Sequence, residues 1–295
     1  MQDIIGLKQE YEKIWNWVLT GKNFALIRNG DGERSLMEGA RFEAQEGWQT
    51  GKVMTGLGQA LLKSIRVDDP NYWIGISCPC CDPEAYKWYL KNIPGKQITL
   101  ANLWVNSNYP AFVAAISNLE RDAVIIANHR AMGKKIGKLN ILDYFCVSDD
   151  CVSFWEEEAP EMIEQIIRKY GKRENLLFVV SAGPMSGPII EKLYRNNPHN
   201  CYLDFGSSID SFYWEIETRP YMNPEMVYAR RHCWMYNPEG NRRRQIWQAG
   251  KLSGKRKFRR NMRAIKAAIP ILPQLAVRKI LGDNAVESIK KKIKR

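Results

Sequence analysis

Seven short apolar runs alternate with helix-length segments, and this alternation restricts the fold more than any other feature of the chain. The runs cover residues 24–27, 72–76, 98–101, 123–127, 142–147, 176–180 and 201–205. Helix-length segments cover residues 56–66, 83–92, 108–119, 156–170 and 186–195, and residues 4–19 have the apolar spacing of an amphipathic helix. We therefore expect an α/β fold with a Rossmann-like, mostly parallel sheet and helices on both faces.

The first apolar run leads into a glycine-flanked turn that carries two carboxylates, Asp31 and Glu33. We expect Gly30 and Gly32 to supply the backbone freedom of a sharp turn. Residues two apart in an extended chain point the same way, so both carboxylates can converge at the edge where α/β sheets bind ligands. Such oxygen ligands suit Mg²⁺ or Mn²⁺ shared with phosphates. At this point a solvated acidic turn remains the alternative.

Two later runs also end in small and polar residues. The run 176–180 leads into Ser181-Ala-Gly-Pro-Met-Ser-Gly187, a turn that can present backbone N–H groups to phosphate or serve only as a tight turn. It fits neither the Walker nor the dinucleotide-binding pattern. The run 201–205 leads into a segment with Asp204 and Asp210. Beyond it, Arg219 either clamps a diphosphate or pairs with an acidic residue.

The composition indicates a globular protein. The chain has 295 residues, of which 45% are hydrophobic, and its first ten residues are charged too often for a secretory signal. We therefore expect a cytoplasmic protein. Seven cysteines, an odd number, indicate reduced thiols. Cys78-Pro-Cys-Cys81 has no second Cys/His pair at finger-like spacing, which favours structural or incidental thiols over a zinc site.

Charge divides the chain into an expected catalytic domain, residues 1–240, and a basic, amphipathic helical tail, residues 241–295. The tail holds 18 Lys or Arg against two acidic residues, whereas the domain holds 26 basic and 30 acidic residues. Pro270 and Pro273 split the apolar part of the tail into short helices, which favours a peripheral anchor on an anionic membrane surface. A solvated tail, a nucleic-acid contact and a helix packed on a partner subunit are the alternatives.

The ordered motifs resemble those of the GT-D-type glycosyltransferases over roughly residues 5–225. Arg28-Asn-Gly-Asp-Gly-Glu33 resembles the family's Arg-Phe-Gly-Asp-Gly-Glu strand end, with Asn29 in place of the aromatic residue. The segments 180–184 and 203–210 resemble its Ser-x-Gly-Pro and Asp-x-Gly-Ser-x-x-Asp turns. The resemblance implies that Asp31 and Glu33 bind a metal, Mn²⁺ or Mg²⁺, together with a sugar nucleotide, for which we favour a UDP-sugar.

The predicted function is therefore transfer of a sugar from a nucleotide-diphosphate sugar to a glycan, glycolipid or glycoprotein acceptor. We favour a hexose as the transferred sugar. The acceptor hydroxyl must lose a proton, and Asp204, Asp210 or Glu215 can serve as its base. The predicted catalytic residues are Asp31, Glu33, Asp204 and Asp210. The predicted donor-binding residues are Arg28, Gly30, Gly32, Ser181, Gly183, Gly206, Ser207 and Arg219.

The sequence is compatible with several partners and with two other functions. Lipid-linked acceptors would place the enzyme on the cytoplasmic face of a membrane, and a homo-oligomer is compatible with the sequence. Nucleic acid is the less favoured partner. The alternative functions are a nucleic-acid-binding α/β protein that uses its basic tail and a Rossmann-like methyltransferase. The methyltransferase is the third hypothesis, after the glycosyltransferase and the nucleic-acid-binding protein.

Overall fold

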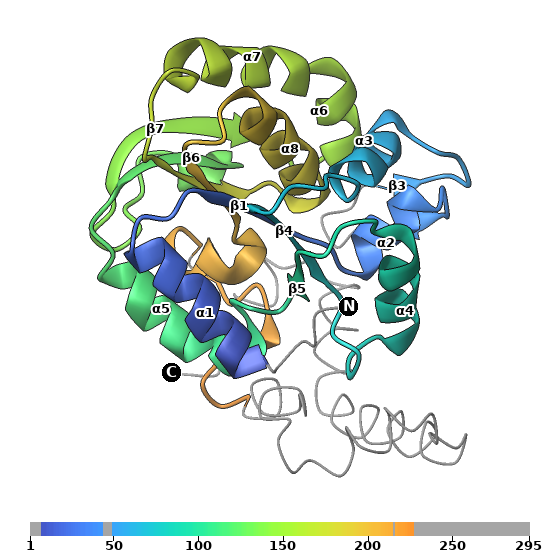
Figure 1. The fold of residues 1–295 in the computed structure, drawn as a ribbon, viewed down its shortest axis with the longest axis horizontal. Coiled ribbons are helices and arrows are strands. Elements are labelled where there is room, and N and C mark those ends of the chain that lie inside the picture. Colours follow the sequence, from blue (N-terminus) through green and yellow to red (C-terminus); the bar gives the residue numbers. More distant parts are fainter. Residues whose placement is uncertain (1–6, 44–48, 215, 227–295) are drawn as a thin grey trace, which may run out of the picture. The chain divides into compact units, whose positions relative to one another are not determined.

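The computed structural model describes residues 7–43, 49–214 and 216–226, without the side chain of Asp31. A seven-stranded, all-parallel sheet with the strand order β5-β4-β1-β9-β8-β6-β7 forms its centre (Figure 1). The strands are β1 (Phe24–Arg28), β4 (Tyr72–Ile76), β5 (Ile98–Leu100), β6 (Asp122–Asn128), β7 (Asn140–Val147), β8 (Leu177–Ser181) and β9 (Cys201–Asp204). The predicted α/β fold with a mostly parallel sheet is thus confirmed.

Helices cover both faces of the sheet (Figure 1). One face packs against α2 (Asp31–Met37), α3 (Gly56–Ser64), α4 (Pro83–Asn92), α6 (Cys151–Glu157), α7 (Ala159–Tyr170) and α8 (Ser186–Asn196). The other face packs against α1 (Leu7–Leu19) and α5 (Tyr109–Ser117). The period-2 alternation of a strand produces this division, because Ala25 and Ile27 face the first group of helices, whereas Phe24 and Leu26 face the second.

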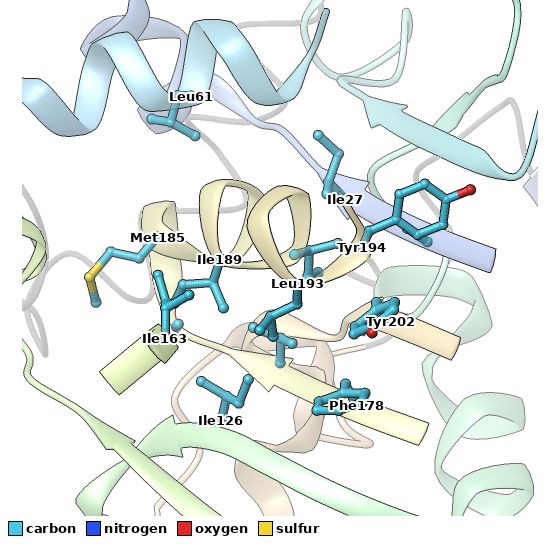
Figure 2. Close-up of a cluster of buried hydrophobic side chains, with 14 of the residues drawn as sticks. Ile27, Leu61, Ile126, Ile163, Phe178, Met185, Ile189, Leu193, Tyr194 and Tyr202 are labelled. Carbon is cyan, nitrogen blue, oxygen red and sulfur yellow. The ribbon is translucent and has the colours of Figure 1, made fainter. Parts of the chain in front are cut away.

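Helix α8 packs directly on the middle of the sheet. Figure 2 shows Ile189 and Leu193 of this helix beside Phe178 of β8 and Tyr202 of β9. The rings of Phe178 and Tyr202 stack with their centroids 4.7 Å apart. This aliphatic and aromatic packing fixes the neighbouring strands β8 and β9, whose carboxyl ends carry two of the predicted turns.

The structure differs from the sequence-based expectation in a few places. The chain after β1 is helical from Asp31, where we expected an extended turn. A small antiparallel pair, β2 (Phe42–Glu43) and β3 (Gln49–Thr50), follows α2. The segment predicted as one helix over 156–170 begins inside α6 and continues as α7.

Short 3₁₀ helices occupy several strand ends and connections: η1 (Asn106–Asn108), η2 (His129–Ala131), η3 (Gly183–Met185), η4 (Gly206–Phe212) and η5 (Pro220–Met222). No helix among the described residues is both long and apolar enough to cross a bilayer. The predicted tail, residues 241–295, lies outside the described residues, as does Glu215.

The strand order changes direction beside β1, at the centre of the sheet. From β1 the chain proceeds to β4 and β5 on one side, whereas β9, on the other side of β1, is reached from β8. In open α/β sheets, ligands bind outside the carboxyl ends of the strands at such a point. The turns that follow β1, β8 and β9 are therefore the ones that can form a site together.

Candidate functional site

The turn after β1 closes into the first turn of α2. Gly30 is the N-cap, Asp31 is the first helical residue and Glu33 is the third. The Glu33 carboxylate turns back, and its Oε2 accepts a hydrogen bond of 2.8 Å from the Gly30 N–H, which is the one capping-box bond that a glycine N-cap allows. The backbone is therefore helical from Asp31 to Glu33, where an extended turn was expected.

The two glycines of this turn are closely packed against neighbouring side chains. Gly30 has φ −107°, and the φ of Gly32 is not positive either. Neither residue therefore uses the unusual backbone conformation that the sequence analysis expected of them. A Cβ at Gly30 would lie 3.3 Å from Oε2 of Glu33, and a Cβ at Gly32 would lie 3.1 Å from the ring of Phe42. A larger residue at either position would push against a side chain that shapes the turn.

Arg28 and Asp204 join the ends of β1 and β9. The Arg28 backbone N–H donates to Oδ2 of Asp204 at 3.1 Å, and the Arg28 guanidinium donates through Nη1 to the Phe205 carbonyl at 2.7 Å. The Arg28 guanidinium also lies against Gly206, where a Cβ would be 3.4 Å from Nη2. Gly206 has φ +49°, a left-handed conformation that favours glycine. The second glycine-containing turn is therefore shaped around Arg28.

Asp204 is 5% exposed, and its environment disfavours the charged form. The pKa of Asp204 is raised to about 7, because burial and the negative charge of Glu33 together outweigh the Arg28 guanidinium and the backbone N–H groups of Arg28 and Gly206. The carboxyl groups of Glu33 and Asp204 therefore interact electrostatically. This part of the site combines one cationic side chain with two interacting carboxyl groups.

The turn after β8 is hydrogen-bonded to the turn after β9. Ser181 Oγ donates to the Gly206 carbonyl at 3.0 Å and lies 3.3 Å from the Tyr213 hydroxyl. The Tyr213 hydroxyl donates to Asp210 Oδ1 at 2.9 Å. Gly183, with φ +53°, forms the left-handed step of the β8 turn. The structure thus brings the predicted residues Ser181, Gly206 and Asp210 into one hydrogen-bonded network.

Asp210 and Ser207 are each fixed by residues downstream of η4. Asp210 Oδ2 accepts from Thr218 Oγ1 at 2.6 Å, so both of its carboxylate oxygens accept hydrogen bonds from hydroxyl groups. The hydroxyls of Ser207 and Tyr221 are 2.7 Å apart. Burial raises the pKa of Tyr221, whereas the positive charges of Arg28 and Arg219 lower it. The two predicted donor-binding arginines therefore both act on Tyr221.

Asn29, directly after β1, has a fully buried side chain. Its exposed fraction is 0%, and neither its amide oxygen nor its amide nitrogen has a hydrogen-bond partner among the described residues. This residue replaces the aromatic side chain of the resembled motif. An unpaired buried amide lowers stability by an amount that an apolar residue would avoid.

Four aromatic residues of the site escaped the sequence analysis. Tyr89 of α4 donates its hydroxyl to the Gly30 carbonyl at 2.6 Å, and the Trp104 indole donates to the Asp204 carbonyl at 3.0 Å. Tyr213 and Tyr221 fix Asp210 and Ser207 as described. Tyr213 and Tyr221 follow the Asp204–Asp210 segment closely in the sequence, which was a usable signal, whereas Tyr89 and Trp104 are distant in the chain from the backbone groups they bind.

Other polar residues lie outside this hydrogen-bonded network. Asn128 and Arg130 lie at the end of β6, where both contact Asp149. The Arg130 guanidinium also lies 4.5 Å from the ring centre of Trp214. The backbone carbonyl of His199 accepts from the Asn175 N–H at 2.9 Å, at the amino end of the sheet. His199 is therefore remote from the strand ends that carry Arg28 and Asp204.

Comparisons with known proteins identify the fold. Neither a protein-family model nor a curated protein matches the sequence. A solved structure of the domain of unknown function 1792, described as having a distinct glycosyltransferase fold, matches with a TM-score of 0.50 and 14% identity over 74% of this chain and 87% of that chain. A selenomethionine structure of the same domain matches with a TM-score of 0.50 and 13% identity over the same shares.

A third structure, a glycosyltransferase with this domain from Streptococcus sanguinis, has a TM-score of 0.49 and 14% identity over 69% of this chain and 82% of that chain. At these identities the first two matches report the fold alone. The GT-D-type fold that the sequence motifs predicted is thus confirmed, and the chain has the distinct glycosyltransferase fold described for the domain of unknown function 1792.

Proposed function

We propose that the chain is a glycosyltransferase that transfers a hexose from a nucleotide-diphosphate sugar to an acceptor hydroxyl. The observation that carries this proposal is the joining of three strand-end turns at the centre of the sheet. Arg28 binds the carbonyl of Phe205, and Ser181 binds the carbonyl of Gly206. The switch point of an α/β sheet is its usual ligand site, and the likeness of the fold supports the same class of activity.

The donor diphosphate requires positive charge and hydrogen-bond donors. Arg28 and Arg219 supply the charge, and their common effect on the pKa of Tyr221 supports a shared site. The hydroxyls of Ser181 and Ser207 and the close backbone approach at Gly183 and Gly206 complete the donor-binding set. A UDP-sugar is the donor that the sequence resemblance favours.

Asp31 and Glu33 would hold Mn²⁺ or Mg²⁺. Carboxylate oxygens suit these hard cations, and the charge of Glu33 already acts on the buried Asp204, so a cation beside these carboxyl groups would reduce their mutual repulsion. Among the described side chains, the carboxyl groups of Glu33 and Asp204 therefore suit such a cation, and Asp31 is added from the sequence. When bound, the metal supplies charge compensation for the diphosphate leaving group.

The acceptor hydroxyl needs a base, for which the chain offers Asp204, Asp210 and Glu215. Asp210 is held in place by the hydroxyls of Tyr213 and Thr218. Asp204 binds the Arg28 N–H, and its pKa of about 7 allows proton exchange near neutral pH. Replacing each carboxylate by its amide and comparing kcat separates the base, which lowers kcat most, from a positioning residue.

The basic tail places the reaction at an anionic membrane surface on the cytoplasmic side, where a lipid-linked acceptor would lie. This part of the proposal rests on the sequence, since residues 241–295 carry 18 basic and two acidic residues. Vesicle flotation tests it directly. Full-length protein should float with anionic vesicles at low salt, whereas protein lacking 241–295 should not. Equal behaviour of the two proteins would contradict the membrane assignment.

The decisive experiment for the activity is a nucleotide-sugar panel with and without Mn²⁺. Donor hydrolysis and the thermal shift caused by the donor are measured on the wild type and on Asp31→Asn and Glu33→Gln. Glu33→Gln keeps an oxygen that can accept the Gly30 N–H and removes only the charge. We expect each variant to lower kcat/KM by at least about 100-fold, the scale for losing a group that stabilises transition-state charge.

The matched control is Glu164→Gln, an exposed carboxylate on α7 whose side chain is 67% accessible, and it should behave as wild type. Metal-independent turnover that is unchanged in both site variants would refute the assigned metal ligands. Salt-sensitive RNA binding without turnover of any nucleotide sugar, or a thermal shift by S-adenosylmethionine alone, would refute the glycosyltransferase assignment.

A further inference from the structure

Three cysteines of the loop between β4 and α4 lie together in space. The sulfur atoms of Cys78, Cys80 and Cys81 all lie within 4.8 Å of one another. Cys78 and Cys80 are 3.0 Å apart and Cys80 and Cys81 are 3.5 Å apart, measured between their Sγ atoms. The sequence spacing favoured incidental thiols because a second Cys/His pair is absent, but one loop here supplies three sulfur atoms by itself.

The backbone of this loop explains the convergence. Pro79 follows Cys78, and the Cys78 carbonyl accepts from the Cys81 N–H and from the Asp82 N–H, both at 3.0 Å. A proline in the second position of a tight turn presets the backbone dihedral that such a turn needs. The turn therefore returns Cys81 to the side of Cys78 with Cys80 between them.

The helix that follows does not use these sulfur atoms as its cap. Asp82 is the N-cap of α4, and its Oδ1 accepts from the N–H groups of Glu84 and Ala85. The backbone donors at this helix end are thus engaged by a carboxylate. The positive end of the helix dipole still favours thiolates nearby, which is the form in which cysteine binds metals.

The geometry is close to that of a thiolate metal site. Around a tetrahedral zinc ion with Zn–S bonds of about 2.3 Å, sulfur atoms are separated by roughly 3.8 Å. The separations of 3.0 and 3.5 Å in this loop are somewhat shorter than that spacing. Cys78 is buried and Cys81 is exposed, so a bound cation would be covered on one side and accessible on the other for a fourth ligand.

We propose that Cys78, Cys80 and Cys81 bind a zinc ion. This site differs from the proposed Mg²⁺ or Mn²⁺ site in its ligand atoms and does not depend on the glycosyltransferase assignment. Its structural effect follows from α4, whose Tyr89 holds the Gly30 carbonyl at 2.6 Å. A cation that fixes the start of α4 would therefore also restrain the turn between β1 and α2.

Metal content and cobalt absorption test the proposal on the full-length protein. Protein purified under reducing conditions without an affinity tag should contain about one equivalent of zinc. After zinc is removed, added Co²⁺ should give thiolate-to-cobalt charge-transfer absorption in the near ultraviolet. Cys78→Ser, Cys80→Ser and Cys81→Ser should each weaken Co²⁺ binding by at least about tenfold, because each variant removes one ligand.

The control is Cys146→Ser, which changes a cysteine of β7 that lies outside the cluster and should keep the full absorption. Circular dichroism identifies any variant that fails to fold. For folded Cys81→Ser, the exposed position, a Cd²⁺ titration measures metal binding a second time, and it should again be weaker than in the wild type. Absence of the charge-transfer band, an equal band in the triple serine variant, iron or copper in place of zinc, or a disulfide among these cysteines in the reduced preparation would each overturn the proposal.

Discussion

Asn200 and Asn29 are both 0% exposed, the first just before β9 at the amino end of the sheet and the second just after β1 at the carboxyl end. Asn200 accepts from the Leu176 N–H at 2.9 Å and donates to the Arg173 carbonyl at 2.9 Å and to the Tyr202 hydroxyl at 3.3 Å. Asn29 has no such partner among the described residues. The same side chain is satisfied at one end and unsatisfied at the other.

The difference indicates that the two ends of the sheet serve different purposes. At the amino end, buried polar groups bind one another, so they stabilise the turns that start the strands. At the carboxyl end, Asp204 is buried with a raised pKa and Asn29 is unpaired, so this end carries features that lower stability. Proteins keep such features at functional sites, which agrees with the proposed donor site.

The largest expected difference is in the free energy of unfolding of two glycine-to-alanine variants. Gly137 before β7 and Gly206 after β9 both have a positive φ, +53° and +49°. A Cβ at Gly137 would lie 2.4 Å from Cα of Ser117, whereas a Cβ at Gly206 would meet only the flexible Arg28 guanidinium at 3.4 Å. We expect Gly137→Ala to lower the free energy of unfolding by about 3–5 kcal/mol and Gly206→Ala by about 1 kcal/mol. Urea unfolding measures both, and equal losses would remove the contrast between the two ends.

The second effect concerns the pH dependence of stability. The pKa of Asp204 is about 7 in the folded chain and about 4 in the unfolded chain. The unfolded chain therefore releases this proton first, so the contribution of Asp204 to stability is complete below pH 4 and is lost as the pH rises to 7. Between pH 5 and pH 8, wild type should lose roughly 2–3 kcal/mol more than Asp204→Asn. Parallel pH profiles of the two proteins would show that the carboxyl group is ionised in the folded state.

The smallest effect compares the two asparagines themselves. Asn200→Ala leaves the Leu176 N–H without its acceptor and should cost about 2–3 kcal/mol. Asn29→Ala removes an unpaired amide, so the relief of its desolvation offsets the lost packing and the change should stay below about 1 kcal/mol. Thermal unfolding of the two variants provides the comparison. A loss at Asn29 as large as that at Asn200 would show that Asn29 is satisfied in the folded protein.

The sequence predicted the sheet well because each strand is recorded locally as a short apolar run. Residues 72–76, for example, were expected as a strand and form β4 with the same bounds. The helical start at Asp31 was missed, because a glycine on each side of Asp31 is typical of a loop and a glutamate in the first helical turn is a weak local signal. Tyr89 and Gly30, which are in contact, are 59 positions apart in the chain, and contacts of this kind leave no periodic pattern in the sequence.

Part of the candidate site was also predictable. The three turns on one sheet edge follow from parallel strands, and Arg28, Ser181 and Gly206 do lie together there. The interaction between Glu33 and Asp204 could not be foreseen, because it depends on the order of β1 and β9 in the sheet. The approach of the three cysteines to one another was not predicted, because spacing rules for zinc fingers count pairs and ignore what a single turn can bring together.

The central position of β9 also determines the order in which the site can be built. β1 leaves the ribosome first, but its neighbour β9 is the last strand of the sheet to be made, and β8 and β9 lie between β1 and β6. Until residue 204 is available, the sets β5-β4-β1 and β8-β6-β7 have no strand to connect them. The contacts between β1 and β9 join residues that are far apart in the sequence. Such contacts make folding slow relative to chains with mostly local contacts. The proposed donor site therefore assembles only when the complete sheet closes at its centre.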